Sequence, residues 1–163
     1  MKPKVLYHAS PNTNIKAFEP RDKSTRTPGE GKLVFATPDP RVAAMFLVPS
    51  EVGPSEIGVY DDRAVIIINA TPHDLEAKDQ GGAIYTLPST TFTVDPKLGM
   101  GVMEWTSKVA VEPIDKKVYP SAIQALAQFG VEIYLVDDAM FRNIQSSEDY
   151  GWSMLESLHP YSR

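Results

Sequence analysis

The 163-residue sequence contains no cysteine. This absence excludes disulfide bonds, zinc sites built from thiolates and a cysteine nucleophile. Histidine is also scarce: His8, His73 and His159 are far apart in the sequence, and none has a second ligand residue at the spacing typical of a metal site. We therefore expect no metal ion and no disulfide framework.

Long hydrophobic runs are missing as well. Two lysines near the N-terminus are followed by the short apolar segment 5–7, whereas the apolar part of a signal peptide needs about 7–15 residues. No stretch approaches the roughly 20 apolar residues that span a bilayer. We expect a soluble, cytoplasmic protein that does not bind membranes.

Positive charge is in deficit. The formal net charge of −5 and the pI of about 5.2 argue against a surface built to hold a nucleic-acid backbone, so nucleic acid is not an expected partner. With 42% hydrophobic and 23% charged residues, the composition is otherwise that of an ordinary folded protein. The length predicts one domain over residues 1–163 and leaves the oligomeric state open.

Fourteen prolines and ten glycines predict many short elements, and their alternation with apolar segments predicts an α+β domain. Residues 65–68 are apolar without alternation, which predicts a central strand buried on both faces. A hairpin is expected around residues 61–63. The expected strands are 5–8, 32–36, 57–60, 64–68, 83–87, 90–94, 102–106, 109–114 and 131–136. The expected helices begin within residues 37–40, cover 120–129, and form a C-terminal helical tail over 137–163.

Three segments carry recognisable chemistry: residues 6–10 (LYHAS), residues 31–37 (GKLVFAT) leading into a helix with two alanines, and residues 103–107 (MEWTS). Their order resembles the NAD-binding core of the ADP-ribosyltransferase fold, as in poly(ADP-ribose) polymerase catalytic domains and the small rifampin ADP-ribosyltransferases. The resemblance implies a single domain with a split, antiparallel-rich β-sheet core and a few short helices, and NAD as the substrate.

The resemblance also implies catalytic roles for Glu104 and His8. Transfer breaks the bond between nicotinamide and ribose through a transition state with positive charge on the sugar. Glu104 would stabilise that charge, by the logic of a glycosidase carboxylate, and hydrogen-bond a ribose hydroxyl. His8 would hold the other hydroxyl. ADP-ribose would pass to an unknown acceptor, a protein or small molecule, or to water.

Further residues are implied to bind the dinucleotide. The backbone of Ala9 and the hydroxyl of Ser10 would orient the nicotinamide amide, and Phe35 or Phe46 would stack on the cationic ring. The phosphates would need a basic patch, for which the candidates are Arg21, Lys32 and Arg41.

Residue alternation on the expected strand 102–106 places Glu104 on the face opposite Met103 and Trp105. If that pair faces the core, Glu104 faces either a cleft or solvent. Members of the family that modify arginine carry a second glutamate two residues earlier. Because Val102 stands there, arginine is not an expected acceptor.

Other interpretations stay open. The tyrosine usual in the second segment is replaced by Val34 or Phe35, so its hydroxyl is absent, and a catalytically degenerate binding module is the main alternative. His8 alone is also consistent with a structural hydrogen-bonding role, and Phe35 and Phe46 with core aromatics. A third possibility is an RNA 2′-phosphotransferase, which needs more cations near these segments than the sequence offers.

Overall fold

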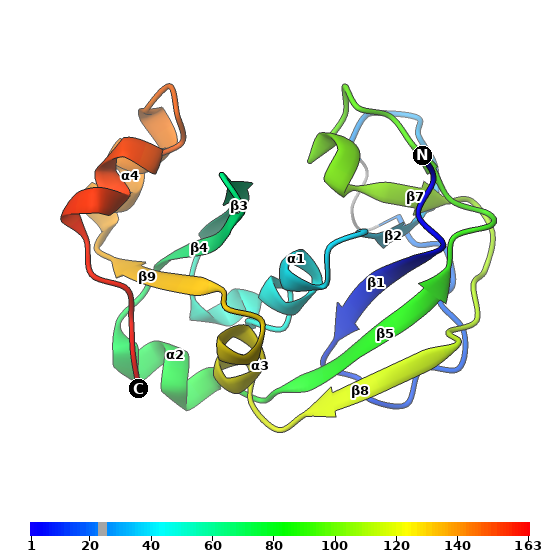
Figure 1. The fold of residues 1–163 in the computed structure, drawn as a ribbon, viewed down its shortest axis with the longest axis horizontal. Coiled ribbons are helices and arrows are strands. Elements are labelled where there is room, and N and C mark those ends of the chain that lie inside the picture. Colours follow the sequence, from blue (N-terminus) through cyan, green and yellow to red (C-terminus); the bar gives the residue numbers. More distant parts are fainter. Residues whose placement is uncertain (23–25) are drawn as a thin grey trace.

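The computed structural model describes residues 1–22 and 26–163, and its strands form three sheets of three strands each. The first two sheets are antiparallel (Figure 1). One has the order β1 (Val5–Ser10), β5 (Gly82–Pro88), β8 (Asp115–Tyr119). The other has the order β2 (Val34–Ala36), β7 (Trp105–Ser107), β6 (Thr93–Val94). The chain thus has the expected mixture of helices and antiparallel-rich sheets.

The third sheet is mixed. β4 (Arg63–Asn69) lies between antiparallel β3 (Ser55–Tyr60) and parallel β9 (Glu132–Val136). The apolar run of β4 is buried along its length, which confirms the predicted central strand. The expected hairpin is also confirmed: Asp61 and Asp62 form the turn with φ of 46° and 66°, the left-handed conformation that tight hairpins require.

Within the described residues, four α-helices connect the strands, and each begins at a side chain that accepts a hydrogen bond from a backbone N–H in the first turn. They are α1 (Pro40–Met45), α2 (Pro72–Lys78), α3 (Ala122–Gln128) and α4 (Asp138–Ser146), and their caps are Asp39, Thr71, Ser121 and Asp137. Short 3-10 helices cover Ser50–Val52 (η1), Gly101–Met103 (η2) and Trp152–Ser157 (η3). No helix within the described ranges combines the length and apolar character needed to cross a bilayer.

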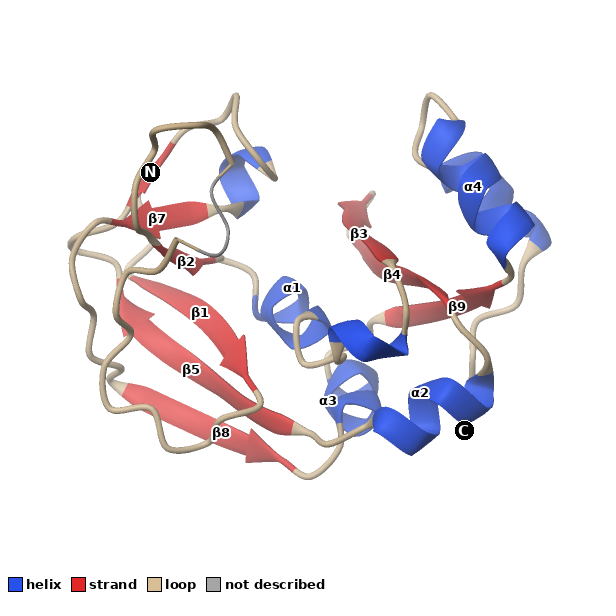
Figure 2. Cartoon of the chain, turned by 180° about the vertical axis from the view of Figure 1, so that it is seen from behind, coloured by secondary structure: helices blue, strands red, loops and turns tan. Residues whose placement is uncertain are grey.

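In the part of the chain that the structure describes, the buried apolar side chains pack in three clusters. The largest surrounds α1 and α3, which lie between the β1-β5-β8 sheet and the β3-β4-β9 sheet (Figure 2). A second joins the two antiparallel sheets through buried residues such as Leu6, Val34 and Tyr85. The third holds α4 and η3 of the C-terminal tail on the outer face of β4 and β9 through Phe141 and Leu155.

Two predicted strands are wrong. Residues 102–103 belong to η2, and the strand begins only at Trp105. Of residues 109–114, Val111 forms an isolated bridge with Phe18, while the real strand, β8, follows at residues 115–119. Most of β8 is exposed at the sheet edge, where charged residues are common and the alternation of apolar side chains is weak.

Candidate functional site

A cavity of about 370 Å³ lies where β1, the end of β2, α1 and η2 meet. We call it the Glu104 cavity. Five of the residues predicted to form the site line it: His8, Ala9, Phe35, Phe46 and Glu104. Its volume falls in the range of small-molecule sites, roughly 300–1,000 Å³. Three segments far apart in the sequence therefore converge on one hollow.

Ser10 and Arg21 instead line a neighbouring cavity of about 210 Å³, which we call the Arg21 cavity. His8 and Phe35 border both cavities. The remaining members of the expected basic patch are engaged elsewhere. Lys32 is exposed and lies 4.0 Å from Asp22. Arg41 pairs with Asp39 and with Asp62 of the β3–β4 turn. Of the three cations expected to form one basic patch, Lys32 and Arg41 thus lie beside acidic side chains, and Arg21 lines the Arg21 cavity.

His8 is positioned by the junction between the two antiparallel sheets. Tyr7 and Thr37 exchange backbone hydrogen bonds of 2.7 and 2.9 Å, which fixes the end of β2 against β1. Next to this junction, Nδ1 of His8 lies 2.6 Å from the carbonyl oxygen of Phe35. Since a carbonyl only accepts, Nδ1 carries the proton and Nε2 is left as the acceptor of the neutral ring.

The environment of His8 keeps that ring neutral. Burial lowers the pKa of His8 and the charge of Arg21 lowers it further, although the hydrogen bond to Phe35 acts in the opposite direction. The ring also packs against Phe18, with centroids 4.6 Å apart. A neutral imidazole whose Nε2 carries no proton can accept a hydrogen bond from a ligand hydroxyl.

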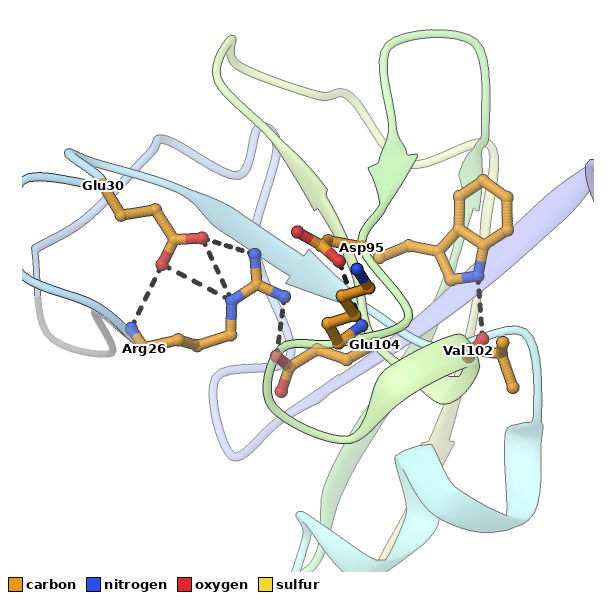
Figure 3. A network of polar contacts seen from close by, with 7 residues as sticks. Arg26, Glu30, Asp95, Val102 and Glu104 are labelled. Atoms are coloured by element: carbon orange, nitrogen blue, oxygen red, sulfur yellow. Dashed lines mark hydrogen bonds and ion pairs between the residues drawn. The ribbon is translucent and has the colours of Figure 1, made fainter.

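Glu104 lies directly after η2, and its backbone N–H donates to the carbonyl of Gly101 over 3.0 Å. The predicted alternation of side chains around it is wrong, because a 3-10 turn rather than a strand precedes it. Met103, expected on the opposite face, lines the same cavity as Glu104. The Trp105 indole donates to the carbonyl of Val102 over 3.0 Å (Figure 3). This bond ties the start of β7 to η2.

Arg26, which the sequence offers only as one of the few cations near the matched segments, contacts Glu104 directly, and this contact was not predicted. Its Nη1 donates to Oε1 of Glu104 over 3.1 Å, and its Nε and Nη2 donate to Glu30 (Figure 3). The hydrogen bond with Glu30 is the main reason that the pKa of Arg26 is raised, so the guanidinium is charged. The same group lies 5.7 Å from the centre of the Phe35 ring, a cation–π distance.

Gly99 lies directly against the carboxylate of Glu104. Its φ of +53° favours glycine, and a Cβ atom here would lie 2.1 Å from Oε1 of Glu104 and 2.9 Å from Cδ of Arg26. The glycine-rich segment 99–101, which looks in sequence like an ordinary turn, therefore makes room for the carboxylate. The two glycines of this segment mark a turn in the sequence, but the sequence does not reveal that Gly99 lies against Glu104.

Comparisons with protein-family models, curated proteins and solved structures give no significant match for this chain. Among the residues that the structure describes, no group of three or more histidine, aspartate or glutamate side chains is placed to hold a metal ion. The chemistry available at the site is that of a carboxylate, a neutral imidazole, two aromatic rings and a guanidinium.

Proposed function

We propose that this protein binds NAD and cleaves its nicotinamide–ribose bond, and that the β1-β5-β8 and β2-β7-β6 sheets are the two halves of an ADP-ribosyltransferase core. One observation carries the proposal: His8, Phe35 and Glu104, from three separate segments, line a single cavity of nucleoside size. The ordering of these segments in the sequence matches the family resemblance.

The chemistry follows from the side chains. Cleavage develops positive charge on the ribose, and the carboxylate of Glu104 would stabilise that charge in the transition state more than in the ground state. Nε2 of His8 would accept a hydrogen bond from a ribose hydroxyl. Phe46 has 56% of its surface exposed while lining the cavity, so its ring is available to stack on nicotinamide.

The rest of the dinucleotide would extend past His8 toward the Arg21 cavity. That cavity shares His8 and Phe35 with the Glu104 cavity, so a ligand that extends past these two residues would border both cavities. Arg21 and the hydroxyl of Ser10, which both line the Arg21 cavity, would then face a phosphate, so Ser10 would not meet the nicotinamide amide that the resemblance assigns to it. This arrangement needs Arg21 alone rather than the wider basic patch.

A second candidate is a binding module that keeps the fold without turnover. Glu104 is already paired with the Arg26 cation, and the usual tyrosine hydroxyl of the second segment is missing. Both features reduce what the carboxylate can contribute to catalysis while leaving the cavity intact.

The test is the release of nicotinamide from NAD by the wild type and by Glu104→Gln. Glu112→Gln removes the same charge from an exposed position and is the matched control. We expect release by the wild type and the control, and loss in Glu104→Gln. Calorimetric binding of NAD without release would favour the binding module. If the wild type neither binds NAD nor releases nicotinamide, both candidate functions are overturned.

A further inference from the structure

A second cavity, of about 340 Å³, lies between the β3–β4 hairpin and the C-terminal tail, and we call it the Trp152 cavity. It is lined by Val65, Ile67 and Leu155, which belong to the buried cluster beneath the tail. Tyr60, Tyr150 and Trp152 supply aromatic surface. In Figure 1 the tail and β3 lie on the opposite side of the molecule's upper gap from β7. The hairpin and the tail thus supply most of the lining, and Gly99 adds to it from the loop before η2.

Local packing and backbone conformation hold these aromatic rings in place. The rings of Tyr60 and Trp152 lie 4.6 Å apart between centroids and are tilted by 34°. A Cβ atom on Gly58 would lie 2.4 Å from the Tyr60 ring, so this glycine lets the ring lie against its own strand. Tyr150 is 61% exposed and holds a left-handed φ of 52°, which is uncommon for a bulky residue.

The charge around these rings is mainly negative. Glu56 of β3 lines the cavity, and its Oε1 accepts a hydrogen bond from Gln145 of α4 over 3.1 Å. Burial raises the pKa of Tyr60, and the charges of Glu56 and Asp149 raise it further. The guanidinium of Arg63 stacks on Trp152 at 4.8 Å, but its charge is compensated by Glu132. Aromatic faces beside a carboxylate favour a flat ligand that carries a positive charge.

The Trp152 cavity and the Glu104 cavity meet at one stretch of backbone. Gly99 lines the Trp152 cavity, whereas the next residue, Met100, lines the Glu104 cavity. A Cβ atom added to Gly99 would lie only 2.1 Å from Oε1 of Glu104. Gly99 therefore borders the Trp152 cavity and also lies against the carboxylate proposed to meet the ribose.

We infer that the Trp152 cavity binds the acceptor of ADP-ribose, and that this acceptor is an aromatic ligand bearing an amine. The inference rests on the proposed function. The bound ammonium ion first loses one proton to solvent and becomes a free amine. In the transfer step, the lone pair of this amine forms a bond to C1′ of the ribose. The bond from C1′ to nicotinamide breaks, and its electron pair leaves with neutral nicotinamide. A second proton then passes from the amine nitrogen to solvent, so atoms and charge balance.

The two tryptophans allow a direct test, because one lies in this cavity and the other follows Glu104. In Trp105→Phe, all tryptophan fluorescence comes from Trp152. The probes are 2-phenylethylamine, 2-phenylethanol, which lacks the charge, and 2-cyclohexylethylamine, which lacks the aromatic ring. We expect the first to bind most tightly. Adding Glu56→Gln should weaken its binding by roughly three- to tenfold, whereas Glu112→Gln should leave it unchanged. Calorimetry on the unsubstituted protein provides a second measurement of the same affinity.

The second arm adds NAD to the wild type with 2-phenylethylamine and measures nicotinamide and ADP-ribosylated amine. Formation of that product, with release faster than in the absence of the amine, is expected. Equal binding of all three probes, or no response of Trp152 or the calorimeter, would overturn the inference. Binding without product from an NAD-cleaving protein would overturn the acceptor role. Probe binding without any NAD cleavage would instead defeat the proposed function while leaving the ligand class of the cavity standing.

Discussion

Nη1 of Arg26 donates a hydrogen bond to Oε1 of Glu104 across 3.1 Å, although 78 positions separate the two residues in the sequence. The same guanidinium lies over Phe35. A planar cation thus already contacts the carboxylate that the proposed function assigns to the ribose, and it lies over Phe35, one of the two rings expected from the sequence to stack on nicotinamide.

Replacing Arg26 should therefore favour a cationic ligand. We expect Arg26→Gln to bind the N-methylnicotinamide cation about threefold or more tightly than the wild type, because a competing charge is removed. Arg26→Lys keeps the charge and should remain near the wild type. Calorimetry measures both. Unchanged or weaker binding by Arg26→Gln would show that Arg26 does not compete for the site.

Gly99→Ala should abolish nicotinamide release at a moderate cost in stability. The new methyl group meets the Glu104 carboxylate, and the left-handed backbone adds about 1 kcal/mol of strain. Gly130→Ala is the control, because Gly130 has a similar φ of +66° with no atom within 4 Å of a built Cβ. Thermal unfolding and nicotinamide assays on both variants separate the two effects. Equal activity in both variants would argue against a role for the Gly99–Glu104 contact.

The lowered pKa of His8 predicts a pH-dependent stability. The unfolded chain binds a proton at His8 near pH 6.5, whereas the folded chain binds it only at lower pH. The unfolded state therefore holds more protons between these two values, and stability falls as the pH drops below about 6.5.

Urea unfolding between pH 5 and 7.5 measures this slope. We expect His8→Asn to flatten it, while His159→Asn, at an exposed position, retains the wild-type profile. A slope that survives in His8→Asn would place its origin in another group.

Asp79 should be a strong contributor to stability. Its carboxylate accepts hydrogen bonds from the Ser121 hydroxyl at 2.5 Å and the backbone of Ala122 at 2.6 Å, joining the end of α2 to the start of α3. Burial alone would raise the pKa of Asp79, but these hydrogen bonds lower it. Asp79→Ala should lose about 1–3 kcal/mol of unfolding free energy in denaturant titrations. Asp115→Ala, on the exposed edge strand, should change little, and similar losses in both would contradict the capping role.

The spacing of apolar and turn residues predicted those helices and strands that depend on residues nearby in the sequence. The β3–β4 hairpin follows from an apolar run beside two aspartates, and α3 follows from its apolar spacing and Gly130. The strand β8 escaped prediction because its lysines are exposed at an edge, and α2 because Leu75 is the one residue it buries.

The site was predictable only where a motif marks it. His8, Phe35 and Glu104 were selected by resemblance, and the fold brings them to one cavity. The contact of Arg26 with Glu104 could not be foreseen, because Arg26 lies in a polar loop with no periodicity. The turn before Glu104 was also misassigned, since residues 102–106 have the alternation of a strand while Gly101 starts a 3-10 helix.

Gly99 and Met100 share one peptide bond, so consecutive residues border the Trp152 cavity and the Glu104 cavity. If a ligand in one cavity shifts this peptide, it changes the affinity of the other cavity. Any change in acceptor affinity caused by NAD must then be matched by an equal change in NAD affinity caused by the acceptor.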